Sequence, residues 1–385
     1  MIKCKIYDRC GGCQLLHKPY EEGLNAKWQE AVELFKKEKL EGAPSAIIGL
    51  EDPYRYRNKM QITFKRQGKS TIGGFYEEST HQVVGLDECI IHSVRVNEIA
   101  TYLPKLIDEL HLLAYDEDRQ NGLIRHALIK ESFAKEEIMV VIVTADEMFP
   151  ARSEFVKRLR AKFPTITTII QNINPRKTSI VLGEKERILY GPGWISDALC
   201  GLRFKITSKS FFQVNPRQTE RLYGVVEKYA ALQGDDTVLD AYSGVGTIGL
   251  VLSKHAKHVH CVENNAQAVK AGISNAKDNQ IKNVTFHCED ATVFLNQIAE
   301  VHDHVDCLIM DPPRTGSTPS FLESILKLKP QKVVYVSCDP TTLVRDLAIL
   351  KKGYQIVEST CVDMFCWTKH VETVALLSRK DSVKK

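Results

Sequence analysis

The sequence lacks an apolar run long enough to cross a bilayer, and its opening MIKCKIYDRC lacks the apolar stretch of a secretory signal. Membrane insertion and secretion are therefore not expected, and a cytoplasmic location is predicted. Neither an internal repeat nor a low-complexity tract is evident. These absences argue against a repeat architecture and a disordered chain, and they leave a globular one.

The composition is that of an ordinary globular protein, with 43% hydrophobic and 26% charged residues. A chain of 385 residues is long enough for two domains or one large domain. The formal net charge is only +4. This mild basic excess is compatible with a nucleic-acid partner but does not require one. No obligate protein partner is indicated.

Eleven cysteines in a chain without a secretory signal are expected to be reduced, as metal ligands, nucleophiles or core residues. Cys4, Cys10 and Cys13 lie close together, with two glycines that allow a tight turn between the last two. Three clustered thiols suggest a metal site, and Cys89 in GLDECIIHS is the candidate fourth ligand. Sulfur ligands suit an iron-sulfur cluster or zinc. The alternative is a set of unligated surface thiols.

The first region reads as β-rich with a few helices. Residues 20–40 carry apolar side chains at helical spacing and predict a helix, and residues 153–163 predict another. Residues 54–85 alternate apolar and polar side chains with glycine punctuation, as in a β-meander. Further strands are expected at 126–132, 137–145 and 165–173.

Basic and aromatic residues are interleaved in the meander. This mixture suits single-stranded RNA, because cations neutralise phosphates and aromatic rings stack on bases. A solvated sheet face explains the pattern nearly as well. The residues are Arg55, Arg57, Lys59, Lys65, Arg66 and Lys69, with Tyr54, Tyr56, Phe64, Phe75 and Tyr76.

Beyond residue 208 a helical segment leads into strictly alternating strands and helices, which predicts an α/β fold with a doubly wound parallel sheet. The chain closes with two strands, at 354–365 and 370–380, expected to form a hairpin at the sheet edge. We therefore predict a β-rich domain at residues 1–205, carrying the cysteine segment, and an α/β domain at residues 206–385. Helix 20–40 is a segment that can pack on the second domain.

Residues 244–249 read GVGTIG between a strand and a helix, and Glu263 ends the next strand. Glycines let a cofactor approach the backbone, and the acid can bind ribose hydroxyls, as in dinucleotide-binding proteins. S-adenosylmethionine needs the same features. Two observations favour it: Asp240 suits a cationic cofactor, and the DPP turn at 311–313 is typical of methyltransferases acting on bases. Asp290, after the third strand, could bond the adenine.

Cys338 lies in VVYVSCDPTTLVRDL, at the end of an apolar strand and before a helical run. Ligands bind at the carboxyl ends of strands in open α/β sheets. The N-terminus of the following helix is expected to lower the pKa of the thiol. Cys338 is thus a candidate nucleophile, although a free cysteine more often packs as a small hydrophobe.

The segments DPPRTG, VVYVSCDPTT and VDMFCWTKHVE, taken in order, resemble the two signatures of the RNA uracil-5-methyltransferases, in the branch that modifies 23S ribosomal RNA. SFFQVNP and DAYSGVGTIGL fit the same family. The resemblance implies a class I methyltransferase that makes 5-methyluridine with S-adenosyl-L-methionine. The RNA-binding TRAM barrel of many relatives is expected to be missing, because Cys4 falls at the start of this sequence.

The resemblance also implies roles for individual residues. Cys338 would attack C6 of the target uracil, and Glu372 would remove the proton from C5. Thiolate addition makes C5 electron-rich enough to accept a methyl group, and removal of the C5 proton then releases the enzyme. The cofactor contacts would be Gln213, Tyr242, Thr247, Glu263, Asp290 and Asp311. A 4Fe-4S cluster would be bound by Cys4, Cys10, Cys13 and Cys89.

The sequence departs from the family pattern in two places. Asp339 follows the candidate nucleophile where the family usually has asparagine, and it should raise the thiol pKa unless Arg314 or Arg345 compensates. Cys366 and Trp367 replace the usual proline-containing turn before the second signature's acid. Three alternatives therefore stay open: a methyltransferase acting on the T-loop of transfer RNA, an RNA-binding iron-sulfur protein with an inactive methyltransferase domain, and, as the weakest, an oxidoreductase.

Overall fold

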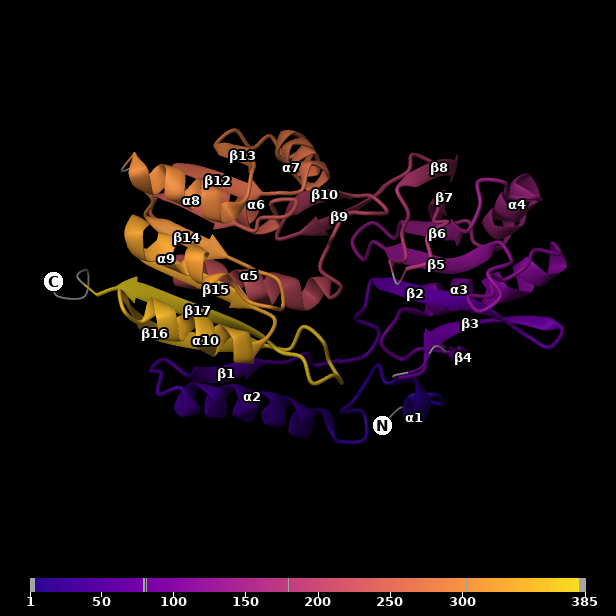
Figure 1. Cartoon of the computed structure of the whole chain (residues 1–385), viewed down its shortest axis with the longest axis horizontal. Coiled ribbons are helices and arrows are strands. Elements are labelled where there is room, and N and C mark those ends of the chain that lie inside the picture. The colour runs from indigo at the N-terminus through magenta and orange to yellow at the C-terminus, as the bar shows by residue number, and fades with distance from the viewer. Residues whose placement is uncertain (1–3, 79, 81, 179, 302–303, 381–385) are drawn as a thin grey trace. The chain divides into compact units, whose positions relative to one another are not determined.

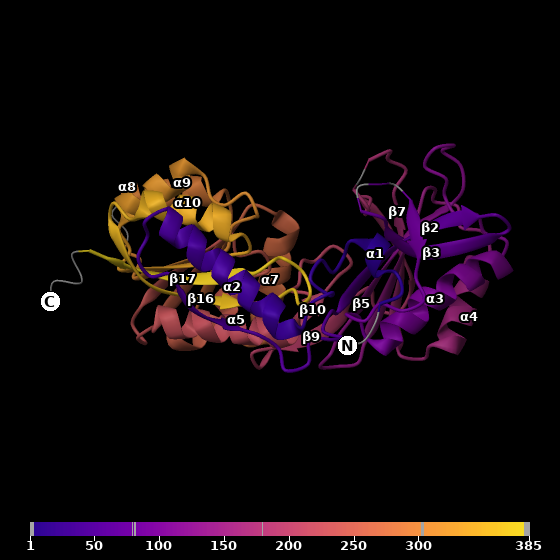
Figure 2. The ribbon, with the colours of Figure 1, turned by 90° about the horizontal axis from the view of Figure 1, so that it is seen from below.

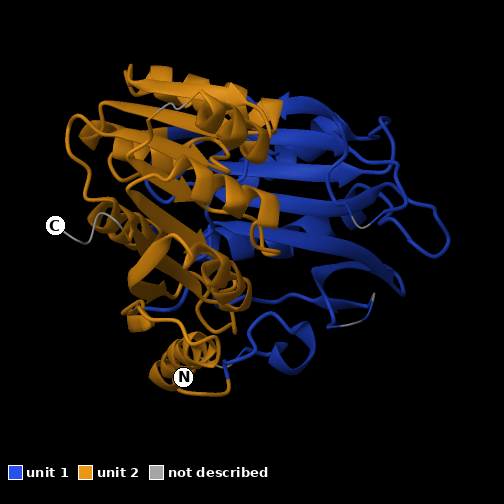
Figure 3. Cartoon of the chain, turned by 60° about the vertical axis from the view of Figure 1, so that its left-hand side comes forward, with its two compact units in different colours: residues 1–16, 52–198, 204–216 blue, residues 17–51, 199–203, 217–385 orange. Residues whose placement is uncertain are grey.

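The structure is a computed structural model that describes residues 4–78, 80, 82–178, 180–301 and 304–380. The chain forms two compact units, and each is built from separate stretches of sequence (Figure 3). Unit 1 comprises residues 1–16, 52–198 and 204–216, and unit 2 comprises residues 17–51, 199–203 and 217–385. The division after residue 205 stays a prediction about functional regions.

Unit 1 contains, within the described residues, a seven-stranded sheet in the order β4-β3-β2-β5-β6-β7-β8 (Figure 1). All pairs are antiparallel except β6 with β7, which the helix α4 connects. The two central strands β5 and β6 are buried along their whole length. The strands are β2 (Lys59–Gln67), β3 (Ser70–Tyr76), β4 (Val83–Gly85), β5 (Ile124–Glu131), β6 (Ile138–Thr144), β7 (Ile166–Ile173) and β8 (Lys185–Tyr190).

The helices of unit 1 are α1 (Tyr7–Cys10), α3 (Val94–Glu109) and α4 (Arg152–Lys162). Helix α3 was not predicted from the sequence. The hydroxyl of Ser93 caps it by accepting a hydrogen bond from the backbone of Val96. Its apolar face packs closely on β3, where a Cβ on Gly73 would come within 3.0 Å of Pro104. The strands and the second helix predicted for this region are confirmed.

Unit 2 contains, in the part of the chain described, an eight-stranded sheet in the order β1-β16-β17-β15-β14-β11-β12-β13. Its strands run parallel except β17, which is antiparallel to both neighbours. The Rossmann-like doubly wound sheet is thus confirmed. The strands are β1 (Pro44–Ile48), β11 (Thr237–Ala241), β12 (His258–Glu263), β13 (Val284–Cys288), β14 (Cys307–Met310), β15 (Lys332–Ser337), β16 (Tyr354–Val362) and β17 (Glu372–Arg379).

Helices cover both faces of this sheet, with α8, α9 and α10 on one side and α5 on the other (Figure 2). One buried core joins α2, α8, α9 and α10 to the central strands, and it includes Phe35, Phe294, Phe321 and Leu343. None of the helices within the described ranges is both long and apolar enough to span a membrane. The helices are α2 (Tyr20–Lys37), α5 (Pro216–Ala230), α6 (Thr247–Leu252), α7 (Ala266–Asp278), α8 (Ala291–Glu300), α9 (Pro319–Leu328) and α10 (Pro340–Leu350), with the 3₁₀ turn η1 (Ser253–His255).

The prediction that the C-terminal hairpin forms the edge of the sheet is wrong. Strands β16 and β17 do pair, but β1 adds in parallel outside β16, with Ile47 opposite Cys361 and Ile48 opposite Val362. The partner strand comes from a segment some three hundred positions earlier in the chain, so no local pattern in the hairpin reveals it. A short two-stranded ribbon, β9 (Ile195–Leu199) with β10 (Leu202–Ile206), completes the described strands.

Candidate active site

Cys338 stands between the end of β15 and the start of α10 and is half-buried. The helix begins with Pro340, a residue favoured at the first helical position. The carboxylate of Asp339 caps it by accepting a hydrogen bond from the backbone of Thr341 at 2.8 Å. The predicted order of strand, cysteine and helix is confirmed, and it brings the thiol to the carboxyl edge of the sheet.

Glu372 is held beside this thiol by strand register. Ser337, the last residue of β15, lies opposite Thr373 of the antiparallel strand β17, so Cys338, directly after Ser337, lies close to Glu372, directly before Thr373. The Glu372 side chain is buried, and its Oε2 has no hydrogen-bond partner among the described residues. A thiol and a carboxyl group with one unpaired oxygen therefore lie close enough for the carboxylate charge to act on the thiol.

Asp311 and Arg314 complete this group from the neighbouring strand. Asp311 follows β14, which runs parallel to β15 with Met310 opposite Tyr335. Arg314 lies three residues further on, in the turn that the DPP sequence begins. One terminal nitrogen of its guanidinium lies 2.9 Å from Nε2 and 3.2 Å from Nδ1 of His370. The cation therefore lies against the imidazole of the residue two positions before Glu372.

The electrostatic balance of the group raises the pKa of the Cys338 thiol to about 11. Burial is the largest cause, the carboxylates of Glu372 and Asp311 add to it, and the Arg314 cation opposes them. The expectation that the helix N-terminus lowers this pKa is wrong, because burial and two carboxylates outweigh the helix. Burial also raises the pKa of Glu372, and the charge of Asp311 raises it further.

The departure at Asp339 has a structural explanation. Its carboxylate is engaged as the N-cap of α10, and the carboxylates that raise the thiol pKa are Glu372 and Asp311. Of the two arginines considered as compensating charges, Arg314 lowers the thiol pKa. Arg345 is instead paired with its neighbour Asp346 at 2.7 Å.

Cys366 and Trp367, the second departure from the family pattern, lie in a loop that contacts helix α2. The ammonium of Lys27 donates to the carboxylate of Asp363 at 2.6 Å, and both side chains are buried. The Tyr20 hydroxyl donates to the same carboxylate at 2.7 Å, and its ring packs on Trp367 with 5.2 Å between centroids. Cys366 is buried with its sulfur 3.6 Å from the Tyr20 hydroxyl. The unusual residues therefore pack against α2, which sequence reasoning had not connected to this loop.

The glycine turn after β11 leaves polar atoms without protein partners. Gly244 has φ +56°, and a Cβ there would meet no atom within 4 Å. Its backbone N–H donates to the carboxylate of Glu263 at 3.0 Å. The buried Oγ of Ser243 and Oδ1 of Asp240 have no hydrogen-bond partner in the described part of the chain. The turn thus provides an open space with unsatisfied polar groups beneath it.

Three further predicted residues lie at the same edge. The hydroxyl of Tyr242, directly after β11, is 3.0 Å from Ser317 Oγ. Thr247 opens α6. Asp290 follows β13 and caps α8 by accepting from the backbone of Thr292 at 2.9 Å. Parallel strands expose their carboxyl ends at one edge, where α/β proteins bind ligands.

The groups at this edge fit S-adenosylmethionine. That molecule carries an ammonium, a sulfonium and a ribose diol. Suitable partners for these groups are the unpaired oxygens near Gly244 and the carboxylates of Glu263, Asp290 and Asp311. Gln213 belongs to unit 1, where its carbonyl accepts from Asn58 Nδ2 at 3.0 Å. Its contact with a cofactor therefore stays a prediction.

Comparison with known proteins identifies the chain. Residues 20–380 match the family described as tRNA (uracil-5-)-methyltransferase. The chain belongs to this family. Two relatives are described as uncharacterized RNA methyltransferases. The one from Clostridium tetani is 40% identical, and the alignment covers 99% of this chain and 84% of the relative. The one from Clostridium acetobutylicum is 42% identical, and the alignment covers 98% of this chain and 83% of the relative.

A solved structure agrees with this assignment. The tRNA (uracil-54, C5)-methyltransferase of Pyrococcus abyssi, in complex with S-adenosyl-L-homocysteine, is 27% identical, with a TM-score of 0.78 over 95% of this chain and 85% of that one. As a member of the family, this chain is an S-adenosylmethionine-dependent RNA uracil-5-methyltransferase.

The four predicted metal ligands of this methyltransferase lie in unit 1. Burial is the main cause that raises the pKa of the Cys13 thiol to about 12, and the charges of Cys89, Cys10 and Cys4 contribute to that rise, so the four thiols lie near one another. No three His, Cys, Asp or Glu side chains within the described ranges are arranged to hold a metal ion. Binding of a metal by these cysteines stays a prediction.

Proposed function

We propose that this methyltransferase makes 5-methyluridine in 23S ribosomal RNA in the cytoplasm, with Cys338 as the nucleophile and Glu372 as the base. The observation that carries the proposal is a thiol close to a buried carboxyl group with an unpaired oxygen, at the edge of the sheet where α/β enzymes bind ligands. A covalent nucleophile and a base within reach of one pyrimidine ring are what methylation at C5 requires.

The first step is addition of sulfur to the ring. The Cys338 thiolate forms a bond to C6 of uracil, and the displaced electron pair moves through C5 to O4 as an enolate. The thiol pKa of about 11 means that its proton must leave before attack, and the cation of Arg314 favours the thiolate. Bound S-adenosylmethionine supplies the methyl group to the electron-rich C5.

The second step restores the ring. The Glu372 carboxylate takes the proton from C5, the electron pair forms the C5–C6 double bond, and the C6–S bond breaks to return the Cys338 thiolate. Burial and Asp311 raise the pKa of Glu372. A carboxylate with a raised pKa is a stronger base, which suits proton abstraction near neutral pH.

The substrate must present an unstacked base, because the Cys338 sulfur and the cofactor must both reach the uracil ring, and neighbouring bases cover both faces of a stacked ring. We therefore propose that the target uridine is flipped out of its stack. The basic and aromatic residues of the β2–β3 region are proposed to hold neighbouring nucleotides. The proposed cofactor contacts are Gln213, Tyr242, Thr247, Glu263, Asp290 and Asp311.

Two substitutions test the catalytic roles. Cys338→Ala is expected to abolish methylation, because no bond to C6 can form. Glu372→Gln is expected to accumulate a covalent protein–RNA adduct, because the C5 proton stays in place. Denaturing gel electrophoresis with labelled RNA measures the adduct, and Cys200→Ala provides a matched control, since Cys200 is also a partly exposed thiol. Full activity of Cys338→Ala would end the proposal.

Transfer RNA is the second candidate substrate, favoured by the family description and by the tRNA enzyme of Pyrococcus abyssi. Ribosomal and transfer RNA purified from a strain lacking the gene distinguish the two. We expect methyl transfer to 23S ribosomal RNA and none to transfer RNA. Methylation confined to the T-loop would replace the ribosomal assignment and leave the chemistry unchanged.

We also propose that Cys4, Cys10, Cys13 and Cys89 bind a 4Fe-4S cluster. The proximity of four thiols in unit 1 supports it, as does the positive φ of Gly11, +63°, which turns the chain between Cys10 and Cys13. Such a cluster would tie the first residues to the segment around Cys89.

Protein purified without oxygen is expected to contain iron and sulfide in equal amounts. Cys13→Ser should lose most of the iron, whereas Cys288→Ser, which changes an exposed cysteine of unit 2, should retain it. Elemental analysis measures both. Stoichiometric zinc without iron would overturn the cluster.

A further inference from the structure

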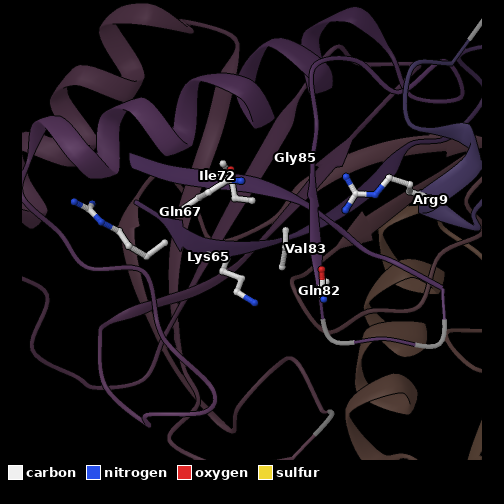
Figure 4. A pocket seen from close by; sticks show the side chains of 8 residues that line it. Arg9, Lys65, Gln67, Ile72, Gln82, Val83 and Gly85 are labelled. Carbon is white, nitrogen blue, oxygen red and sulfur yellow. The ribbon is translucent and has the colours of Figure 1, made fainter. Parts of the chain in front are cut away.

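Unit 1 contains a pocket of about 310 Å³ on its sheet. It is bounded by the end of β2, by β3, by β4 and by helix α1, and in Figure 4 the guanidinium of Arg9 points toward the strand that carries Val83 and Gly85. The lining side chains combine cations, carboxamides and aliphatic groups. They are Arg9, Lys65, Arg66, Gln67, Ile72, Gln82 and Val83, with Gly85 at the base.

The pocket opens on the face of the sheet that helix α3 does not cover. Successive residues of a strand point to opposite faces. Thr71 points toward α3, where its hydroxyl donates to Asp108 at 2.7 Å. Its neighbour Ile72 therefore points to the other face, together with Lys65, which lies directly opposite it on β2. This face is accessible to a ligand.

The three cations at the pocket differ in how their charge is balanced. Arg9 is paired with Glu77 at 2.9 Å, and Arg66 with Asp108 at 3.1 Å, so both guanidinium groups are held in position. Lys65 makes no salt bridge with a carboxylate in the described ranges, although its charge acts on the nearby carboxylate of Asp116. The pocket thus presents an exposed ammonium beside the anchored guanidinium of Arg9, whereas Arg66 reaches Asp108 on the face that α3 covers.

Gly85 keeps the base of the pocket open. Its φ lies outside the left-handed region, so the backbone does not demand glycine there. A Cβ at this position would meet only Ile72, at 3.9 Å, so packing does not demand glycine either. Glycine within a strand often marks a place where a ligand or another backbone comes close. Space for a ligand is the property that glycine provides here.

We infer that this pocket binds one nucleotide of the RNA substrate, an inference that rests on the proposed function. Lys65 and Arg9 bind the phosphate. The aliphatic side chains of Ile72 and Val83 pack against the ribose and base, and the carboxamides of Gln67 and Gln82 bond the base edges. The volume lies at the lower end of the range for ligand pockets and suits a single nucleotide.

Two substitutions test the pocket by different physical means. Lys65→Glu reverses the charge at an exposed position, and Gly85→Val fills the space with a side chain that strands favour. Lys105→Glu is the matched control, because Lys105 is an exposed lysine on α3, which covers the other face of the sheet. Methyl transfer to RNA is followed at several salt concentrations, and melting temperatures check that each variant is folded.

Both pocket variants are expected to raise KM for RNA about tenfold with kcat unchanged. Lys65→Glu should also reduce the slope of log affinity against log salt by about 1, which Gly85→Val should not do. Lys105→Glu should match the unaltered enzyme. If only Lys65→Glu raises KM, Lys65 is a surface cation that attracts RNA and there is no nucleotide pocket. If neither variant changes KM, RNA does not contact this surface. Either result overturns the inference.

The same assay separates this inference from the proposed function. If the unaltered enzyme methylates no uridine at C5, the proposed function fails. If it does, and the two pocket variants keep its KM, only the nucleotide pocket fails.

Discussion

At the scale of single residues, the decisive feature is the environment of Cys338, whose burial raises the thiol pKa most and whose charged neighbours modify it. Two carboxyl groups, Glu372 and Asp311, and one guanidinium, Arg314, act on a partly buried thiol whose pKa is raised to about 11. At pH 7 roughly one thiol in ten thousand is then a thiolate. Alkylation of the free enzyme near neutral pH is therefore expected to be slow, and attack on uracil requires a proton acceptor in the site.

Alkylation of Cys338 by iodoacetamide should report this raised pKa. Because only the thiolate reacts, the rate should rise about tenfold per pH unit from pH 7 toward 10. Glu372→Gln removes a negative charge and should speed the reaction, and Arg314→Gln removes the opposing cation and should slow it. Mass spectrometry of the Cys338 peptide measures the rate. A plateau below pH 8 would show that the thiol pKa is not raised.

The sequence motifs identified Cys338 and Glu372 as candidates but not their state of protonation. A helix N-terminus generally lowers the pKa of a nearby thiol, which predicts a lowered pKa for Cys338. In the structure the pKa of Cys338 is raised instead. The main reason is the burial of the thiol, and Glu372 adds to it. Glu372 lies 34 positions further along the chain, and the pairing of β15 with β17 brings it close to the thiol. The direction of a pKa shift depends on such neighbours.

At the scale of elements, helix α2 and the loop before β17 act together. The buried pair of Lys27 with Asp363 connects them, and Lys27 also donates to the carbonyl of Phe365 at 3.0 Å. The loop leads directly into Glu372, the first residue of β17. A helix far away in sequence therefore holds the segment that positions the proposed base.

Lys27→Met should destabilise this loop strongly. It leaves the Asp363 carboxylate buried without its cation, a change that costs about 3–5 kcal/mol in buried pairs. Melting temperature and hydrogen exchange of β16 and β17 measure the loss. Lys36→Met on the same helix is the control, because Lys36 is exposed. The double variant Lys27→Met with Asp363→Asn should recover part of the stability, because it also removes the buried negative charge. A Lys27→Met protein as stable as the control would contradict the role of the pair.

The helix at residues 20–37 could be predicted from its apolar spacing, but the burial of Lys27 could not. A lysine in an amphipathic helix normally lies on the solvated face, and nothing in the local pattern marks this one as different. The same holds for β1, whose partner β16 lies at the other end of the chain. The pairing of strands that lie far apart in the sequence is determined only when the sheet assembles.

At the scale of the whole molecule, the N-terminal segment contributes to both units. Residues 1–16 belong to unit 1, whereas residues 17–51 supply α2 and β1 to unit 2. Phe35 of α2 is fully buried in the core beneath the sheet, and Leu40 lies in the same cluster. The sheet that carries the candidate active site therefore depends on residues from the start of the chain.

Two deletions should separate these contributions. Removal of residues 1–16 should leave binding of S-adenosylmethionine unchanged, because unit 2 keeps all its elements. Removal of residues 1–51 should abolish binding, since it uncovers β16 and the core around Phe35. Isothermal titration with the cofactor measures both. Equal binding by the two truncated proteins would contradict the role assigned to α2 and β1.

By itself, the sequence determined the α/β class, the glycine turn at residues 244–249 and the family, because periodicity and short motifs are local properties of a chain. Only the tertiary structure decided that β1 lies at the sheet edge, that Lys27 is buried, and that Glu372 raises the pKa of Cys338. Each of these depends on residues that are distant in sequence and become neighbours only when strands pair and helices pack.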